Sequence, residues 1–83
     1  MGSPEEDATG EEIYVQLCAR CHSADLSGGI GPALGPETNS ALEDDEYLEF
    51  TILNGRGSMP SFASLDPAQL DRLVAYMREV QGE

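Results

Sequence analysis

Two cysteines and a histidine stand together in the first third of the chain, in the order Cys18-Ala19-Arg20-Cys21-His22. The pattern C-x-x-C-H is typical of the attachment site of a c-type haem. In a helical segment Cys18 and Cys21 lie about one turn apart, so both sulfurs reach the same side. That offset suits thioether bonds to the two vinyl groups along one haem edge. His22 follows directly as the predicted proximal iron ligand, and it is the only histidine in the sequence.

A redox dithiol and a zinc site are two other interpretations of the same residues. A thioredoxin-like C-x-x-C pair belongs in a βαβ unit, and no segment of four or more residues alternates as a strand would. A structural zinc ion needs four ligands. Cys18, Cys21 and His22 supply three, so a carboxylate would have to be the fourth. The pattern therefore favours haem over both alternatives.

A haem iron bound by His22 has a sixth position, and the candidate ligands are the thioethers of Met59, Met77 and Met1. Pro60 disfavours the α conformation at Met59, which suits a side chain that projects from a loop. Met77 lies on a predicted apolar helix face, where methionine is more often core packing. An open or water-bound iron is the remaining alternative. We predict Met59 as the sixth ligand; His/Met ligation raises the reduction potential, and it occupies both axial positions.

Two shorter helices are expected to position the haem motif and the loop that carries Met59. The first is predicted over residues 10–21, with Thr9 as its N-cap. The second is predicted over residues 44–54 and ends at an Asn-Gly pair, which favours a left-handed stop. Ser40 with Glu43 forms a competing capping box, which is an alternative start for this helix.

The third helix has the most complete set of signals. Asp66 is its predicted N-cap, Pro67 fits the first helical position, and Gln69 completes a capping box. An apolar stripe follows at Leu70, Leu73, Val74, Met77 and Val80. A glycine-rich loop over residues 23–39 and a second loop over residues 56–65 join the helices. The chain is thus predicted to be all-α, with loops so long that they need an internal surface to lie against.

The composition limits the partners and the size of the fold. Eighty-three residues allow one domain, predicted over residues 9–83 after a mobile acidic lead-in at residues 1–8, which is a cloning remnant or a linker. Sixteen acidic residues against four arginines and no lysine leave a net charge of -12. This charge argues against nucleic acid and anionic lipid surfaces, which need clustered cations. It favours protein partners with a basic or apolar docking patch.

Four blocks of sequence resemble the small class I c-type cytochromes, especially the short bacterial monohaem type. The first is Gly10 with Ile13-Tyr14 ahead of the haem motif, and the second is Gly31-Pro32-Ala33-Leu34. The others are Asn54-Gly55-Arg56-Gly57-Ser58-Met59-Pro60 and Leu73-Val74-Ala75-Tyr76-Met77. The haem motif is highly specific, and the resemblance covers roughly residues 10–80. It implies an all-α class I cytochrome c-like fold, with three main helices and glycine-rich loops around one haem c bound through its two cysteines.

The resemblance also implies roles for single residues. Gly10 and Tyr14 are expected to meet Tyr76 where the first and last helices cross. The Pro32 carbonyl is expected to orient the imidazole of His22. Leu34 should pack on the histidine side of the haem, and Arg56 should pair with a haem propionate. Candidates for the haem wall are Ile52, Phe50 and Phe62. Each has a plainer interpretation: an ordinary turn at Pro32, an exposed loop arginine, and core packing for the apolar residues.

Two departures from the family bear on docking. Mitochondrial-type members carry a ring of lysines around the haem edge, whereas this chain has none. The loop between Leu34 and the second helix is short, so the propionate side is expected to be more open. The acidic run Glu43, Asp44, Asp45, Glu46 and Glu49 is either a solvated helix face or a docking patch.

The predicted function is one-electron transfer, with no residue acting as acid, base or nucleophile. The chain is expected to be a monomeric, non-enzymatic carrier in the periplasm or another extracytoplasmic space. It is either free or the haem domain of a larger or membrane-anchored respiratory or photosynthetic protein, including a larger oxidoreductase. The alternative is a haem-based sensor or ligand-binding domain in which Met59 is displaced.

Overall fold

The structure is a computed structural model that describes residues 4–36, 38–57 and 59–82. Its helices are α1 (Gly10–Leu17), α2 (Ala19–His22), α3 (Asn39–Leu42), α4 (Asp45–Asn54) and α5 (Pro67–Gly82). Within the described ranges there is no β-strand, and Arg56 and Met59 form an isolated antiparallel bridge. The all-α prediction is therefore confirmed. No helix in this part of the chain is long and apolar enough to cross a lipid bilayer.

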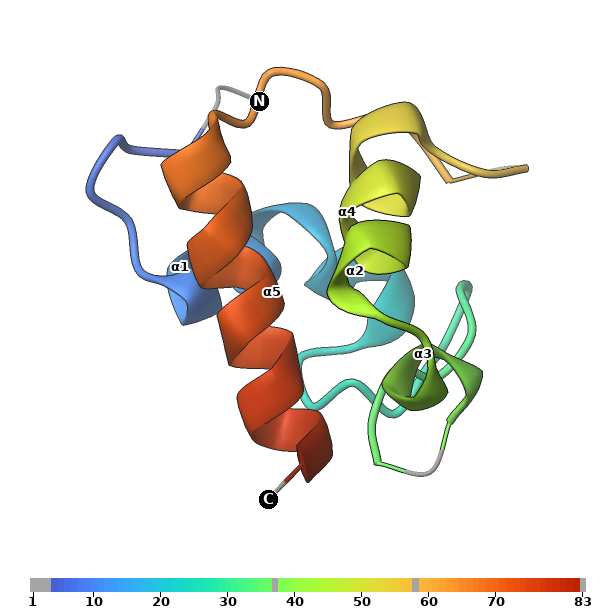
Figure 1. The fold of residues 1–83 in the computed structure, drawn as a ribbon. Helices are drawn as coiled ribbons and strands as arrows, with labels where there is room; N and C mark the ends of the chain where they lie inside the picture. Colours follow the sequence, from blue (N-terminus) through green and yellow to red (C-terminus); the bar gives the residue numbers. More distant parts are fainter. Residues whose placement is uncertain (1–3, 37, 58, 83) are drawn as a thin grey trace.

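Helices α1 and α5 cross and form the main packing contact of the fold (Figure 1). At the crossing, a Cβ on Gly10 would lie 2.1 Å from the Arg72 carbonyl oxygen, so the two backbones approach closely. The rings of Tyr14 and Tyr76 pack with their centroids 5.7 Å apart. The Tyr14 hydroxyl donates a hydrogen bond of 2.7 Å to the Ser23 carbonyl. Burial, the largest cause, raises the pKa of Tyr14, so this donor keeps its proton.

Replacing Gly10 with alanine should destabilise the crossing. The added methyl group meets a backbone carbonyl rather than the flexible end of a side chain, so the helices have to separate. We expect a loss of about 1–3 kcal/mol in the free energy of unfolding, the usual range for overpacking. Urea denaturation followed by far-ultraviolet circular dichroism measures it. The control is Gly82→Ala, because no atom lies within 4 Å of a Cβ there. Equal stability of the two variants would contradict the prediction.

The first predicted helix is divided in the structure. Its start is confirmed, because Thr9 and Glu12 form a capping box with bonds of 3.1 and 2.8 Å. The prediction of one helix over residues 10–21 is wrong. Cys18 has φ -110°, away from the helical value, and its N–H donates to the Tyr14 carbonyl at 2.8 Å. The Cys18 carbonyl in turn accepts from the His22 N–H at 3.0 Å, so this residue ends α1 and begins the α2 turn.

Helix α4 begins close to its predicted start at residue 44, and α5 begins at its predicted cap, Asp66. The Asp44 carboxylate accepts from the Tyr47 N–H at 2.9 Å, and α4 ends before Gly55. At α5, Asp66 and Gln69 exchange hydrogen bonds of 2.8 and 2.9 Å, which confirms the capping box. The competing start near residue 40 corresponds to a separate four-residue helix, α3, which was not predicted; the Ser40 side chain lies outside the described part.

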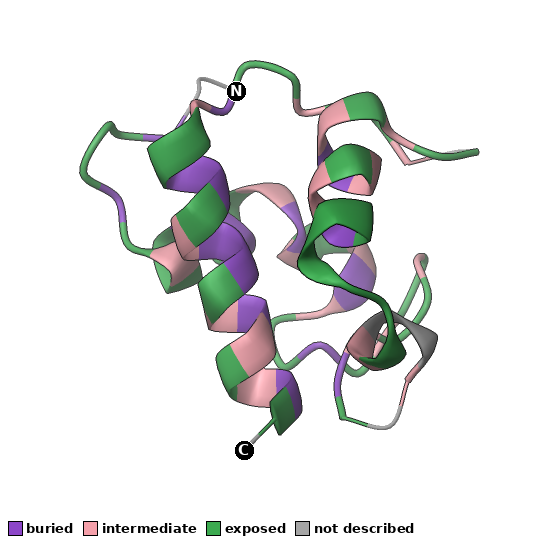
Figure 2. Ribbon diagram, in the orientation of Figure 1, coloured by how far each residue is buried: buried purple, intermediate pink, exposed green. Residues whose placement is uncertain are grey.

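The core lies between the inner faces of α1, α4 and α5 (Figure 2). The predicted stripe on α5 is largely confirmed, since its members are buried except for Val80, which is partly buried. Leu26 from the loop after α2 is fully buried as well. Its φ of +65° is unusual for a leucine, and the sequence pattern did not predict this burial.

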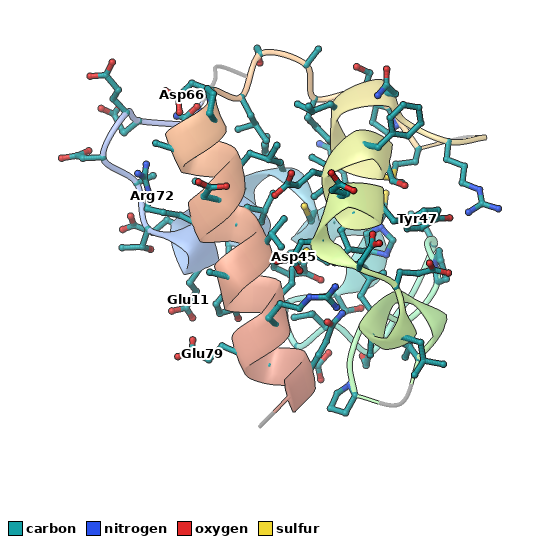
Figure 3. The ribbon with its side chains drawn as sticks, viewed as in Figure 1. Glu11, Asp45, Tyr47, Asp66, Arg72 and Glu79 are labelled. Atoms are coloured by element: carbon teal, nitrogen blue, oxygen red, sulfur yellow. The ribbon has the colours of Figure 1, made fainter. Side chains whose placement is uncertain are left out.

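The segment before α1 is hydrogen-bonded to α5. The Arg72 guanidinium donates to the carbonyls of Ala8 at 2.8 Å and Glu6 at 2.7 Å (Figure 3). The Gln69 amide donates to the Glu5 carbonyl at 3.1 Å. These bonds use backbone groups of the acidic segment and leave its carboxylates in solvent. The mobility of residues 1–8 stays a prediction, and the contacts favour an ordered course over the part that the structure describes.

Candidate haem site

The His22 side chain is buried and held by one ring nitrogen. Its Nδ1 lies 2.7 Å from the carbonyl oxygen of Pro32. A carbonyl only accepts hydrogen bonds, so Nδ1 carries the proton and donates. The neutral ring then has its lone pair on Nε2, the form that binds a metal. This contact is the one expected from the resemblance, and it fixes the orientation of the imidazole ring.

The loop that carries Pro32 is bonded back onto the haem motif. The Gly31 N–H donates to the Cys21 carbonyl at 2.7 Å, and the Gly28 N–H donates to the His22 carbonyl at 2.9 Å. Within the loop, the Ser23 hydroxyl donates to the Gly28 carbonyl at 2.6 Å. The loop therefore keeps one place relative to α2. A Cβ on Gly31 would lie 2.7 Å from His22 Cε1, so the backbone of residue 31 packs directly on the imidazole.

The two cysteines are free thiols in different environments. Cys18 is buried and Cys21 is partly exposed. Burial, with a smaller contribution from the charge of Cys21, raises the pKa of the Cys18 thiol to about 12. A reactive redox dithiol needs a lowered thiol pKa, so this environment argues against the dithiol interpretation. Among the described residues, no three or more histidine, cysteine or carboxylate side chains are grouped so that they could hold a metal ion.

Met59 lies in the loop that follows α4, partly buried against the core. Its N–H donates to the Arg56 carbonyl at 2.8 Å, and the Arg56 N–H donates back to its carbonyl at 3.2 Å. The Arg56 side chain is exposed and donates to the Tyr47 hydroxyl; its pairing with a propionate stays a prediction. Met77 is buried in the core on α5, as expected for packing. Met1, the third candidate ligand, lies outside the described residues.

The predicted haem-wall residues separate into two groups. Ile52 is buried on the inner face of α4, and its carbonyl accepts from the Phe62 N–H at 2.9 Å. Phe62 and Leu34 are partly buried against the same core. Phe50 is 66% exposed, because two residues along a helix turn a side chain by about 200° from Ile52. The structure therefore does not bring Phe50 to the site.

A polar junction near the C-terminal end of α5 was not predicted. The Gln81 amide donates to the Leu34 carbonyl at 2.7 Å, although the glutamine is buried. Arg78 donates to Gln81 at 2.9 Å and to the Asp45 carboxylate at 2.8 Å, and it also donates to the Glu43 carbonyl. In Figure 3, Asp45 lies on the side of α4 toward α5. The junction ties both the loop beside His22 and the start of α4 to α5.

The donor set fits a covalently attached haem. His22 presents one nitrogen donor with a fixed tautomer, two thiols lie in the adjoining turn, and a thioether lies in a separate loop. Hard oxygen donors are absent from the predicted ligand set, which suits iron in a macrocycle better than a bare hard cation.

Comparison with known proteins decides the family. Residues 5–77 match the family described as cytochrome C oxidase, cbb3-type, subunit III. The chain belongs to this family of c-type cytochromes. The cytochrome is accordingly a small monohaem protein domain whose cofactor is one covalently bound haem c.

Its relatives include proteins named as cytochromes and a much longer dehydrogenase. The chain is 46% identical over 74 residues to dihydro-heme d1 dehydrogenase from Pseudomonas aeruginosa, covering 86% of this chain and 15% of that protein. It is 45% identical over 51 residues to cytochrome c-551 from Bacillus subtilis, covering 61% of this chain and 44% of that protein. The solved structure of cytochrome cL from Hyphomicrobium denitrificans superposes with a TM-score of 0.77 at 33% identity, over 87% of this chain and 45% of the other. The predicted class I cytochrome fold is thereby confirmed.

Proposed function

We propose that the cytochrome carries single electrons, with haem bound through Cys18 and Cys21 and with His22 and Met59 as axial ligands. The observation that carries the proposal is the hydrogen bond between His22 Nδ1 and the Pro32 carbonyl, which leaves Nε2 as the metal-binding atom. When bound, haem supplies a one-electron ferrous–ferric couple. The rest of the chain holds the ligands in place and excludes water from the iron.

Each group of residues has a distinct part in this function. Pro32 keeps the proton on His22 Nδ1, which raises the basicity of the ligand nitrogen. The loop bonds between Arg56 and Met59 hold the thioether-bearing residue against the core. Ile52, Leu34 and Phe62 supply the apolar wall, and Arg56 is placed in the loop where it would pair with a propionate. If His22 and Met59 both bound the iron, no ligand position would be left for a substrate, and the domain would transfer electrons rather than act as an enzyme.

The cytochrome works either as a free carrier or as the haem domain of a longer redox protein. The second setting is supported by the dehydrogenase relative, of which the chain spans 15%, and the first by the relative named as a cytochrome, of which it spans 44%. Haem attachment of this kind places the domain outside the bacterial cytoplasm. Its partners are redox proteins with basic or apolar docking surfaces, because the net charge is -12. We expect a monomer.

An absorption spectrum of protein made with the haem-attachment machinery tests this proposal. Low-spin bands on reduction by dithionite, together with the weak far-red band of methionine bound to ferric iron, are expected. Carbon monoxide should not bind rapidly to the ferrous protein at neutral pH. A high-spin spectrum with rapid carbon monoxide binding would instead support the sensor alternative, in which the sixth ligand is displaceable. A colourless protein would exclude both.

A further inference from the structure

The outward face of α4 combines exposed apolar side chains with carboxylates. Phe50 is 66% exposed and Tyr47 is 37% exposed, although both are large aromatic residues. Together with Leu53 they line a shallow groove that is edged by acidic residues, and we call this surface the α4 outer face. Its acidic members are Glu43, Asp44, Glu46 and Glu49. In Figure 3, Tyr47 projects from the side of α4 away from α5.

The α4 outer face lies on the opposite side of the helix from the core cluster. Leu48 and Ile52 on the opposite side of α4 are buried in the same core cluster as Cys18, where the haem is attached. Phe50 is two positions from each of them, which places it about 200° around the helix axis. The chain itself does not cover Phe50, and Figure 2 shows the exposed side of α4 facing the viewer. An exposed apolar surface that is rimmed by polar residues is a form that protein interaction sites take.

The charges around the groove indicate what kind of partner fits. Four carboxylates edge it, and Asp45, the fifth acid of this run, is turned to Arg78 on the α5 side. The nearby cation on this side is Arg56, which donates to the Tyr47 hydroxyl at one end of the face. An apolar centre with a charged rim has the general form of a protein interface. A complementary partner would present lysines or arginines around an apolar centre.

We propose that the α4 outer face docks the basic redox partner of this cytochrome, with Phe50 as the apolar anchor and the carboxylates as the steering rim. The inference rests on the proposed function, because it places the partner of the same electron transfer. The surface lies on the far side of α4 from the haem-bearing core. An α-helix is about 10 Å across including side chains. One helix thickness thus separates a partner docked here from the core.

The probe for the charge effect is mitochondrial-type cytochrome c, whose lysine ring surrounds an apolar haem edge. The ferrous holoprotein is mixed with the ferric probe in a stopped-flow instrument at several salt concentrations. The rim variant is Glu43→Gln with Glu46→Gln and Glu49→Gln, and the control is Glu5→Gln with Glu6→Gln and Asp7→Asn. Both variants remove three charges, but the control residues lie before α1. At low salt we expect the rim variant to react about tenfold more slowly and the control less than threefold, since steering depends on local charge.

Binding is measured separately from electron transfer. Titration of isotope-labelled ferrous holoprotein with the reduced probe should shift the amide resonances of residues 43–53 more than those of residues 5–16. Phe50→Ser should raise the dissociation constant about fivefold or more, as removal of a central aromatic anchor does. Val15→Ser is the control, because Val15 is also exposed, at 53%, but lies on α1. It should change the constant by less than twofold.

These measurements distinguish a failure of the docking proposal from a failure of the electron-carrier proposal. Equal slowing by the two charge variants, or resonance shifts centred outside residues 43–53, would overturn the docking proposal. An unchanged dissociation constant for Phe50→Ser would do the same. Shifts at α4 without any reduction of the ferric probe would support the docking surface and count against the carrier function.

Discussion

Replacing Met59 with alanine should open the sixth position of the iron. The variant is expected to lose the far-red ferric band and to bind carbon monoxide rapidly in the ferrous state, because no thioether competes for the metal. Its reduction potential should fall, since a methionine ligand favours ferrous iron. We expect a fall on the order of 0.1 V or more, within the span of about 0.8 V that axial ligation sets. Potentiometric titration and carbon monoxide mixing measure the two effects.

Met77→Leu is the matched control for this prediction. Met77 is 4% exposed in the core of α5, so its packing can be kept by a side chain of similar volume. The control should keep the far-red band and its potential, at a stability cost below about 1.5 kcal/mol. Loss of the band in Met77→Leu, with the band retained in Met59→Ala, would reverse the assignment of the sixth ligand.

The parts of the fold that local chemistry determines could be predicted from the sequence. The caps at Thr9 and Asp66 are confirmed because a side-chain oxygen and a nearby N–H suffice to form them. The stripe of α5 follows from helical periodicity, which is a property of the segment alone. The contact between Pro32 and His22 was expected from the family resemblance rather than from the residues themselves.

The features that depend on distant segments could not be predicted in the same way. Nothing in the residues around Gln81 indicates that its amide bonds to Leu34, which is 47 positions away. The burial of Leu26 depends on a left-handed backbone conformation that leucine seldom adopts. Even the break at Cys18 has no helix-breaking residue to signal it. In each of these places tertiary packing overrides the local preference, which only the folded structure reveals.

Replacing Gly31 with alanine should disturb the predicted iron ligand, His22, without substituting any residue of the haem motif. The added Cβ would lie 2.7 Å from Cε1 and 2.9 Å from Nδ1 of His22, closer than such atoms approach. The backbone of Gly31 has little freedom to retreat, because its N–H is bonded to the Cys21 carbonyl at 2.7 Å and its carbonyl accepts from the Gly29 N–H at 2.9 Å. The imidazole therefore has to turn, which weakens its hydrogen bond to Pro32.

The sign of the resulting change in potential follows from this hydrogen bond. A carbonyl acceptor at Nδ1 makes Nε2 more basic and so favours ferric iron. Weakening the bond should raise the reduction potential of Gly31→Ala by tens of millivolts, given about 59 mV per tenfold change for one electron. The control is Gly35→Ala, whose Cβ would make an ordinary contact of 3.7 Å with the Leu26 carbonyl. A destabilised Gly31→Ala protein with an unchanged potential would show that Gly31 serves packing alone, because lost packing does not by itself alter the basicity of the histidine ligand.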